Sequence, residues 1–182
     1  MRKIHHICYI IFAGFFISCG EENVNAVHQN YYDIAAFFKN ESAALQKNNL
    51  KIEKVIVKDG IKDARSFTNV DWQKELKPFA DCDINKPAWI NAYNVDSIPS
   101  AGNRMQIIYS AKEEKMPLRR IEINSMNDSV QMITIHKERH NFYYQSDDHY
   151  TYHSGKGYEI NGSQKVHFLD KTVYEIKSTF IQ

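Results

Sequence analysis

The residues best suited to chemistry lie in the last third of the sequence, where carboxylates and imidazoles fall close together. Asp147, Asp148 and His149 are consecutive, and His153 follows on the same stretch. A loop here would gather two carboxylates and two imidazoles, which are groups that zinc and related divalent ions take as ligands. The alternative interpretation is a polar hairpin turn, because Asp-rich turns between strands are common. The four residues are therefore candidate metal ligands, although the sequence requires neither a metal nor another cofactor.

A second pair of histidines, His136 and His140, lies in a segment with the alternation of a β-strand. Residues i and i+4 of a strand are about 13 Å apart at roughly 3.3 Å per residue, so these two cannot share one ion. The sequence also lacks the metalloprotease helix motif, a phosphate-binding loop and a nucleophile elbow. We therefore expect no enzymatic activity. An envelope hydrolase that uses the carboxylates with His149 or His153 is an alternative.

Aromatic residues gather in the same region. Tyrosines on a strand can line a site for an apolar or sugar-like ligand, or can contact a partner protein. The alternative is that they pack a half-buried face, because tyrosine favours strands. The predicted ligand or partner face consists of five tyrosines, namely Tyr143, Tyr144, Tyr150, Tyr152 and Tyr158.

The N-terminus has the pattern of a signal peptide. Arg2 and Lys3 precede an apolar stretch over residues 7–17, which is too short for a membrane-spanning helix of about 20 residues. The stretch ends in Phe16-Ile17-Ser18-Cys19, which resembles the lipobox of bacterial lipoproteins, although Phe16 replaces the commoner leucine. The resemblance implies cleavage before Cys19 and attachment of a diacylglyceryl group to its sulfur.

The lipobox sets the expected organisation of the chain. Residues 1–18 are the signal peptide, residues 19–27 a lipidated tether and residues 28–182 a single domain. Two or more acyl chains hold a protein firmly on a membrane, so the predicted location is the cell envelope, at the outer membrane. The acidic pair Glu21 and Glu22 resembles the signal that sends some lipoproteins to the cell surface. The alternative is a solvated tether on the periplasmic face.

The composition of the chain limits the classes of partner and the possible disulfides. The chain has 23 basic and 22 acidic residues and a formal net charge of +1, so it lacks the basic excess expected of a nucleic-acid-binding protein. Of its three cysteines, Cys8 falls in the signal peptide and Cys19 is lipidated, which leaves Cys82 without a disulfide partner. Cys82 is predicted to be a small, semi-buried residue, because Asp81 and Asp83 disfavour a reactive thiolate.

Hydrophobic periodicity predicts an α+β fold. A long N-terminal helix is expected over residues 27–47, and a short second helix follows Asn69 or Asp71. These helices are expected to pack on a curved antiparallel β-sheet, a half-barrel-like meander. The predicted strands cover residues 51–58, 61–68, 88–98, 105–111, 118–126, 130–137, 142–145, 150–153, 165–169 and 173–180, with a turn at Asn161-Gly162.

A second resemblance covers most of the predicted domain. The helix-first order, the segment Asp83-Ile84-Asn85-Lys86-Pro87-Ala88-Trp89 and the later Gln164-Lys165-Val166 resemble lipoproteins of unknown function from Bacteroidota. The expected architecture is also similar to half-barrel carriers that move lipoproteins between membranes. The sequence thus predicts a lipid-anchored, non-catalytic binding or accessory module for a protein, an apolar ligand or a glycan. A lipid or lipoprotein carrier is the alternative.

Overall fold

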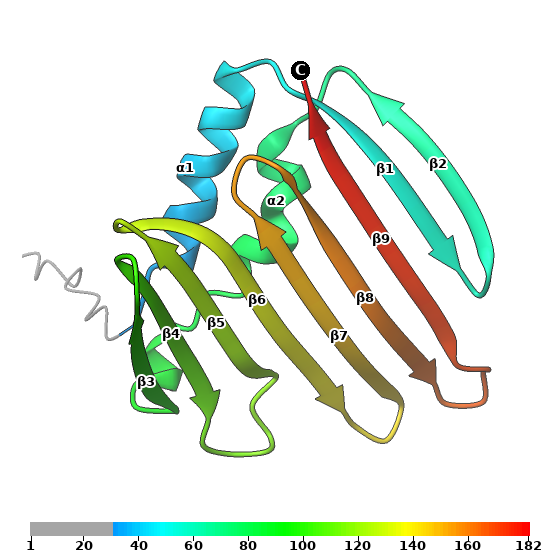
Figure 1. Cartoon of the computed structure of the whole chain (residues 1–182). Coiled ribbons are helices and arrows are strands. Elements are labelled where there is room, and N and C mark those ends of the chain that lie inside the picture. The colour runs from blue at the N-terminus through cyan, green and yellow to red at the C-terminus, as the bar shows by residue number, and fades with distance from the viewer. Residues whose placement is uncertain (1–30) are drawn as a thin grey trace, which may run out of the picture.

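The computed structural model describes residues 31–182, which form two α-helices, one 3-10 turn and nine strands (Figure 1). The predicted signal peptide and tether, with Cys19, Glu21 and Glu22, lie outside the described residues. The helices are α1 (Ile34–Lys47) and α2 (Trp72–Ala80), and the turn is η1 (Pro87–Trp89). The strands are β1 (Lys51–Lys58), β2 (Ile61–Phe67), β3 (Tyr93–Ser100), β4 (Arg104–Ala111), β5 (Leu118–Met126), β6 (Ser129–His140), β7 (Tyr144–His153), β8 (Gly157–Val166) and β9 (Thr172–Ile181).

The nine strands form one antiparallel sheet in the order β2-β1-β9-β8-β7-β6-β5-β4-β3. Strands β3 to β9 follow one another as a meander. The β1–β2 hairpin joins this meander because β1 pairs with the C-terminal strand β9. Strands β2 and β3 are the two edges, so the sheet is open rather than closed into a barrel. The predicted α+β class with an antiparallel meander is confirmed.

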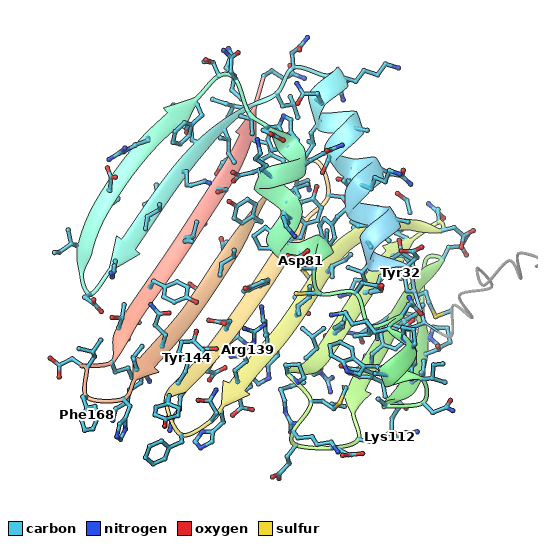
Figure 2. All side chains as sticks on the ribbon, turned by 180° about the vertical axis from the view of Figure 1, so that it is seen from behind. Tyr32, Asp81, Lys112, Arg139, Tyr144 and Phe168 are labelled. Atoms are coloured by element: carbon cyan, nitrogen blue, oxygen red, sulfur yellow. The ribbon has the colours of Figure 1, made fainter. Side chains whose placement is uncertain are left out.

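Both helices pack on the same face of the sheet, near one end of the strands (Figures 1 and 2). We call this the helix-covered face and the opposite one the outer face. Each helix begins at an aspartate whose side chain accepts a hydrogen bond from the first turn, Asp33 in α1 and Asp71 in α2. Apolar side chains at helical spacing then face the sheet, and those that are buried are Ile34, Phe38, Leu45, Trp72, Leu76 and Phe79. Within residues 31–182, neither helix is long and apolar enough to cross a membrane.

The long N-terminal helix predicted from residue 27 is wrong in its extent, because α1 begins only at Ile34. Asn85 holds the preceding chain outside the helix. Its side-chain oxygen accepts from the Tyr31 backbone N–H at 3.1 Å, and its amide nitrogen donates to the Tyr31 and Tyr32 carbonyls at 3.2 Å. These backbone groups are therefore satisfied by a residue distant in sequence rather than by another helical turn.

Several predicted boundaries in the second half of the chain are also wrong. The expected strand over residues 88–98 begins with η1, and β3 starts only at Tyr93. Asn161-Gly162, predicted as a turn, lies inside β8, and residues 147–148, predicted as a loop, lie inside β7. Pairing with neighbours on both sides keeps β7 and β8 extended despite their local turn preference. Conversely, β8 ends at Val166, so most of the predicted strand over residues 165–169 is a turn.

Candidate functional site

Strand geometry divides the predicted metal cluster between the two faces of the sheet. Because β7 is one continuous strand, its side chains alternate, and Asp147, His149 and His153 lie exposed on the outer face. Asp148 points the other way and is only 6% exposed. His153 shares the outer face with His149 but stands four residues further along the strand, about 13 Å away. The expected group of four ligands is therefore not brought together.

Asp148 instead belongs to a structural contact with β9. Its carboxylate accepts a hydrogen bond from the Tyr174 hydroxyl. Burial is the main cause that raises the pKa of Tyr174, and this hydrogen bond is the second. Gly162 on β8 lies between them. A Cβ there would stand 2.4 Å from Asp148 Oδ1 and 2.7 Å from the Tyr174 hydroxyl, so only glycine leaves room for the pair.

A different histidine joins Asp147 and His149. His136 on β6 is the direct cross-strand partner of His149, and their rings stack with centroids 4.3 Å apart and planes 8° from parallel. The Nε2 atoms of His136 and His149 lie 2.9 Å and 3.3 Å from the same oxygen, Asp147 Oδ1. We call these three residues the His–Asp–His triplet. Sequence reasoning considered His136 only with His140 on its own strand, and missed the pairing because it depends on the β6–β7 register.

The predicted tyrosine face is also divided. Tyr150, Tyr152 and Tyr158 lie in the core beneath the helices and are less than a tenth exposed. Only Tyr143 is widely exposed, and Tyr144 is half-buried. The interpretation that these tyrosines pack a buried face is therefore right for the three that α1 and α2 cover.

The buried tyrosines fasten the helices to the sheet. Tyr152 donates its hydroxyl hydrogen to Glu41 on α1, and Tyr158 donates to Glu75 on α2. Burial is the main cause that raises the pKa of both hydroxyls, and the hydrogen bond to the neighbouring carboxylate is the second. They stay protonated and act as donors, which is a structural role rather than a catalytic one.

A group of exposed apolar side chains lies at the end of the sheet that the helices leave uncovered. It consists of Phe142 and Tyr143 in the β6–β7 turn, with Phe168 and Leu169 in the β8–β9 turn. Their exposed fractions are 73%, 69%, 93% and 64% in that order. We call these four residues the tip. Figure 2 shows Phe168 and Tyr144 at this end, away from Asp81 at the end of α2.

The two turns of the tip are joined into one surface. The Asn141 side chain accepts hydrogen bonds from the Tyr143 and Tyr144 backbone N–H groups at 2.9 Å and 2.8 Å, which fixes the first turn. The His167 backbone N–H donates to the Tyr143 carbonyl at 2.8 Å, which ties the second turn to the first. The centroid of the His167 ring lies 4.8 Å from that of the Phe142 ring and 3.9 Å from that of the Phe168 ring.

Phe168 adopts a backbone conformation that bulky residues rarely take, with φ of +68°. Such a conformation costs about 1–3 kcal/mol, and the exposed ring recovers little of it by burial. Phe168 had no signal in the sequence, because the predicted strand over residues 165–169 places it in a sheet.

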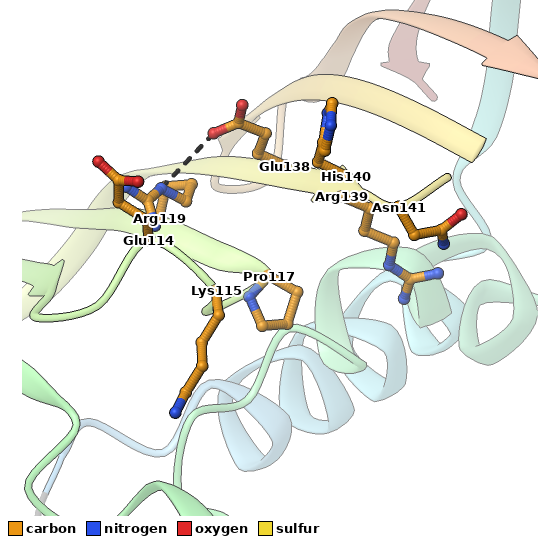
Figure 3. A pocket seen from close by; sticks show the side chains of 8 residues that line it. All are labelled: Glu114, Lys115, Pro117, Arg119, Glu138, Arg139, His140 and Asn141. Carbon is orange, nitrogen blue, oxygen red and sulfur yellow. Dashed lines mark ion pairs between the residues drawn. The ribbon is translucent and has the colours of Figure 1, made fainter. Parts of the chain in front are cut away.

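A hollow of about 860 Å³ lies between the β4–β5 loop and the end of β6, beside the first turn of the tip (Figure 3). Its lining mixes both signs of charge, and an ion pair of 3.5 Å joins Arg119 to Glu138 at its side. The lining residues are Glu114, Lys115, Pro117, Arg119, Glu138, Arg139, His140 and Asn141. The hollow therefore forms a border of mixed charge beside the tip.

Cys82 is inert in the folded chain. It is fully buried rather than semi-buried, and burial above all, with a smaller contribution from Asp81, raises the pKa of its thiol to about 11. A thiol at such a pKa is protonated at neutral pH and is a poor nucleophile.

Comparison of the chain with known protein families, curated proteins and solved structures found no match. The fold and the surfaces described above are therefore the basis for assigning a function.

Proposed function

We propose that this protein is a lipid-anchored protein of the cell envelope that acts as a non-catalytic binding module, with the tip as its binding surface. The single observation that carries the proposal is the exposure of four large apolar side chains on two adjacent turns. Contiguous apolar groups on a protein surface mark interaction sites, because leaving them in water is unfavourable. The predicted lipid at Cys19 supplies the membrane attachment.

The partner that fits this surface best is another envelope protein. The tip offers an aromatic centre, and the surface beside it carries charges of both signs, including Arg139, His140, Lys165 and Lys171 with Glu138 and Asp147. An apolar aromatic centre within a polar rim is the anatomy of a protein–protein interface. A surface that bound chiefly to anionic lipid would carry a uniformly basic rim instead.

The alternatives fit the geometry less well. A half-barrel carrier for lipid would need an apolar inner face where the helices leave the sheet open. That part of the helix-covered face carries Lys137, Arg139 and Asp148, and charged groups disfavour contact with acyl chains. A hydrolase of the predicted kind would need both carboxylates beside His149 or His153. Only Asp147 lies beside His149, while Asp148 is buried on the other face and His153 stands further along β7.

Site-specific crosslinking in the producing cells tests the binding surface. With a photoreactive phenylalanine analogue in place of Phe168, we expect a discrete protein adduct, because this side chain would lie at the centre of the interface. The control places the same analogue at Ile61, which is 76% exposed on the edge strand β2, and should give no adduct of that mass. Adding Leu169→Ser should lower the yield at position 168 several-fold. Equal yields at both positions, or lipid adducts alone, would contradict the proposal.

Lipidation is tested separately by growing cells with an alkyne-bearing fatty acid and measuring label on the purified chain. We expect Cys19→Ser to abolish the label, because the lipobox makes its sulfur the acceptor. The matched control is Cys8→Ser, which removes the other cysteine of the N-terminal segment and should leave the label unchanged. Retention of label in the Cys19 variant would rule out this anchor.

A further inference from the structure

We infer that His136, Asp147 and His149 form a binding site for one divalent transition-metal ion, such as Zn²⁺, on the outer face of the sheet. Two imidazole nitrogens and one carboxylate oxygen are a donor set that suits this class of ion. The three ligand atoms already lie within 4.8 Å of one another. The inference rests on this geometry and does not depend on the tip or on its partner.

The sheet itself places the three ligands. His136 and His149 are directly opposite in the antiparallel pairing of β6 with β7, and Asp147 stands two residues before His149 on the same face. Cross-strand and i+2 neighbours on one face are the shortest side-chain spacings that a sheet offers. Both strands are paired on each side, β6 with β5 and β7 with β8, so the backbone that carries the ligands is held firmly.

The separations of the ligand atoms are compatible with one shared ion. The Nε2 atoms of both rings approach one oxygen of Asp147, at 2.9 Å and 3.3 Å. Ligands of a tetrahedral zinc ion, with bonds of about 2.0–2.2 Å, lie roughly 3.3 Å apart, so these two separations match those between ligands of one ion. The two stacked rings would turn out of parallel so that both Nε2 lone pairs point at the ion. An exposed contact between histidine and aspartate contributes little to stability by itself.

Charges of both signs surround the triplet. Arg120 faces His136 from β5, but its Nε lies 2.6 Å from Glu122 Oε1, which offsets the guanidinium charge. Glu138 faces Asp147 from β6 and pairs with Arg119. On β8 the positions opposite His149 and Asp147 are the uncharged Asn161 and Ser163. Each of the two arginines is thus paired with a carboxylate, and Lys165 and Lys171 line the same hollow as Asp147. Binding of a cation therefore depends on the three ligand atoms and not on an excess of negative charge.

Three protein ligands leave at least one coordination position free on the exposed side. Catalytic zinc sites and sites shared between proteins have this open arrangement, whereas closed structural sites use four protein ligands. An ion here would therefore accept water or a side chain from a partner.

Zinc titration of the full-length chain in detergent, against a competing chromophoric chelator, tests the inference. We expect His149→Gln to weaken the affinity for one equivalent of Zn²⁺ by at least tenfold, and His136→Gln to do the same. The matched control is His153→Gln, an exposed histidine on the same strand and face that should leave the affinity unchanged. Zinc taken up by the remaining histidines and cysteines is common to all variants and does not affect the difference between them.

Electron paramagnetic resonance with Cu²⁺ as the probe gives an independent reading. The spectrum of the wild-type chain should show two imidazole nitrogens at one copper, and His149→Gln should remove one of them. Near-ultraviolet circular dichroism shows that each variant keeps its fold. Equal losses in the His149 and His153 variants, or no loss in either, would overturn the inference.

Discussion

Replacing Phe79 with alanine is expected to lower the free energy of unfolding by about 3–5 kcal/mol. Phe79 is fully buried between the helices and the sheet. Its ring centroid lies 5.2–5.8 Å from four other rings, those of Phe38, Tyr150, Tyr152 and Tyr158. Removing the ring opens a cavity at the point where α1, α2 and the central strands meet. Tyr152 and Tyr158 cannot move in to fill it, because their hydroxyl groups are held by Glu41 and Glu75.

Urea unfolding followed by tryptophan fluorescence measures this loss, since Trp72 is buried in the same core, with its ring 4.8 Å from that of Phe180. Phe168→Ala is the matched control, because it removes the same side chain from a position that is 93% exposed. We expect that variant to change stability by no more than about 0.5 kcal/mol. Comparable losses in the two variants would show that the aromatic cluster under the helices is not the centre of stability.

Replacing Gly157 with alanine is expected to lower the free energy of unfolding by about 2–5 kcal/mol, because backbone strain and a steric clash act together. Gly157 begins β8 with φ of +153°, which side chains disfavour. A Cβ there would stand 2.1 Å from the backbone oxygen of Ser178 on β9. Since that oxygen belongs to a paired strand, relief requires β8 and β9 to separate locally, which breaks ladder hydrogen bonds.

Gly155→Ala is the control for this prediction. Gly155 lies in the turn just before β8 with φ of +66°, but a Cβ at this position would have no neighbour within 4 Å, so only the conformational cost of about 1 kcal/mol applies. Thermal unfolding by circular dichroism measures both variants. If the two glycine substitutions cost the same, the close approach of Ser178 is not the reason that glycine is required at position 157.

Much of the fold could be predicted from local pattern. The cap at Asp71 indicated the start of α2, and the strands predicted over residues 51–58 and 61–68 are β1 and β2. These signals survive because capping and alternation act over a few residues and agree with the tertiary packing. Predicted element boundaries were wrong where a residue distant in sequence binds the backbone. Asn85, for example, holds Tyr31 and Tyr32 outside α1.

The candidate sites were less accessible to sequence reasoning. Asp147 and His149 could be found because they are near neighbours, but their third member, His136, comes from the preceding strand. That partnership depends on the register of β6 against β7, and a slip of one residue would move His136 to the opposite face. The tip likewise depends on two turns that are far apart in sequence, since Phe142 and His167 are separated by 25 residues. The backbone hydrogen bond from His167 to Tyr143 joins these two turns.

Local sequence and composition were enough to indicate most element types, the lipobox pattern at Cys19 and the near-neutral charge of the chain, because each depends on neighbouring residues or on residue counts. Which side chains meet became clear only in the folded chain. Folding buries Tyr150, Tyr152 and Tyr158 under the helices, leaves Phe168 in water, and brings His136 to Asp147 and His149. Strand pairing and helix docking join distant parts of the chain, so they assign each side chain to a face and a neighbour that its local sequence does not specify.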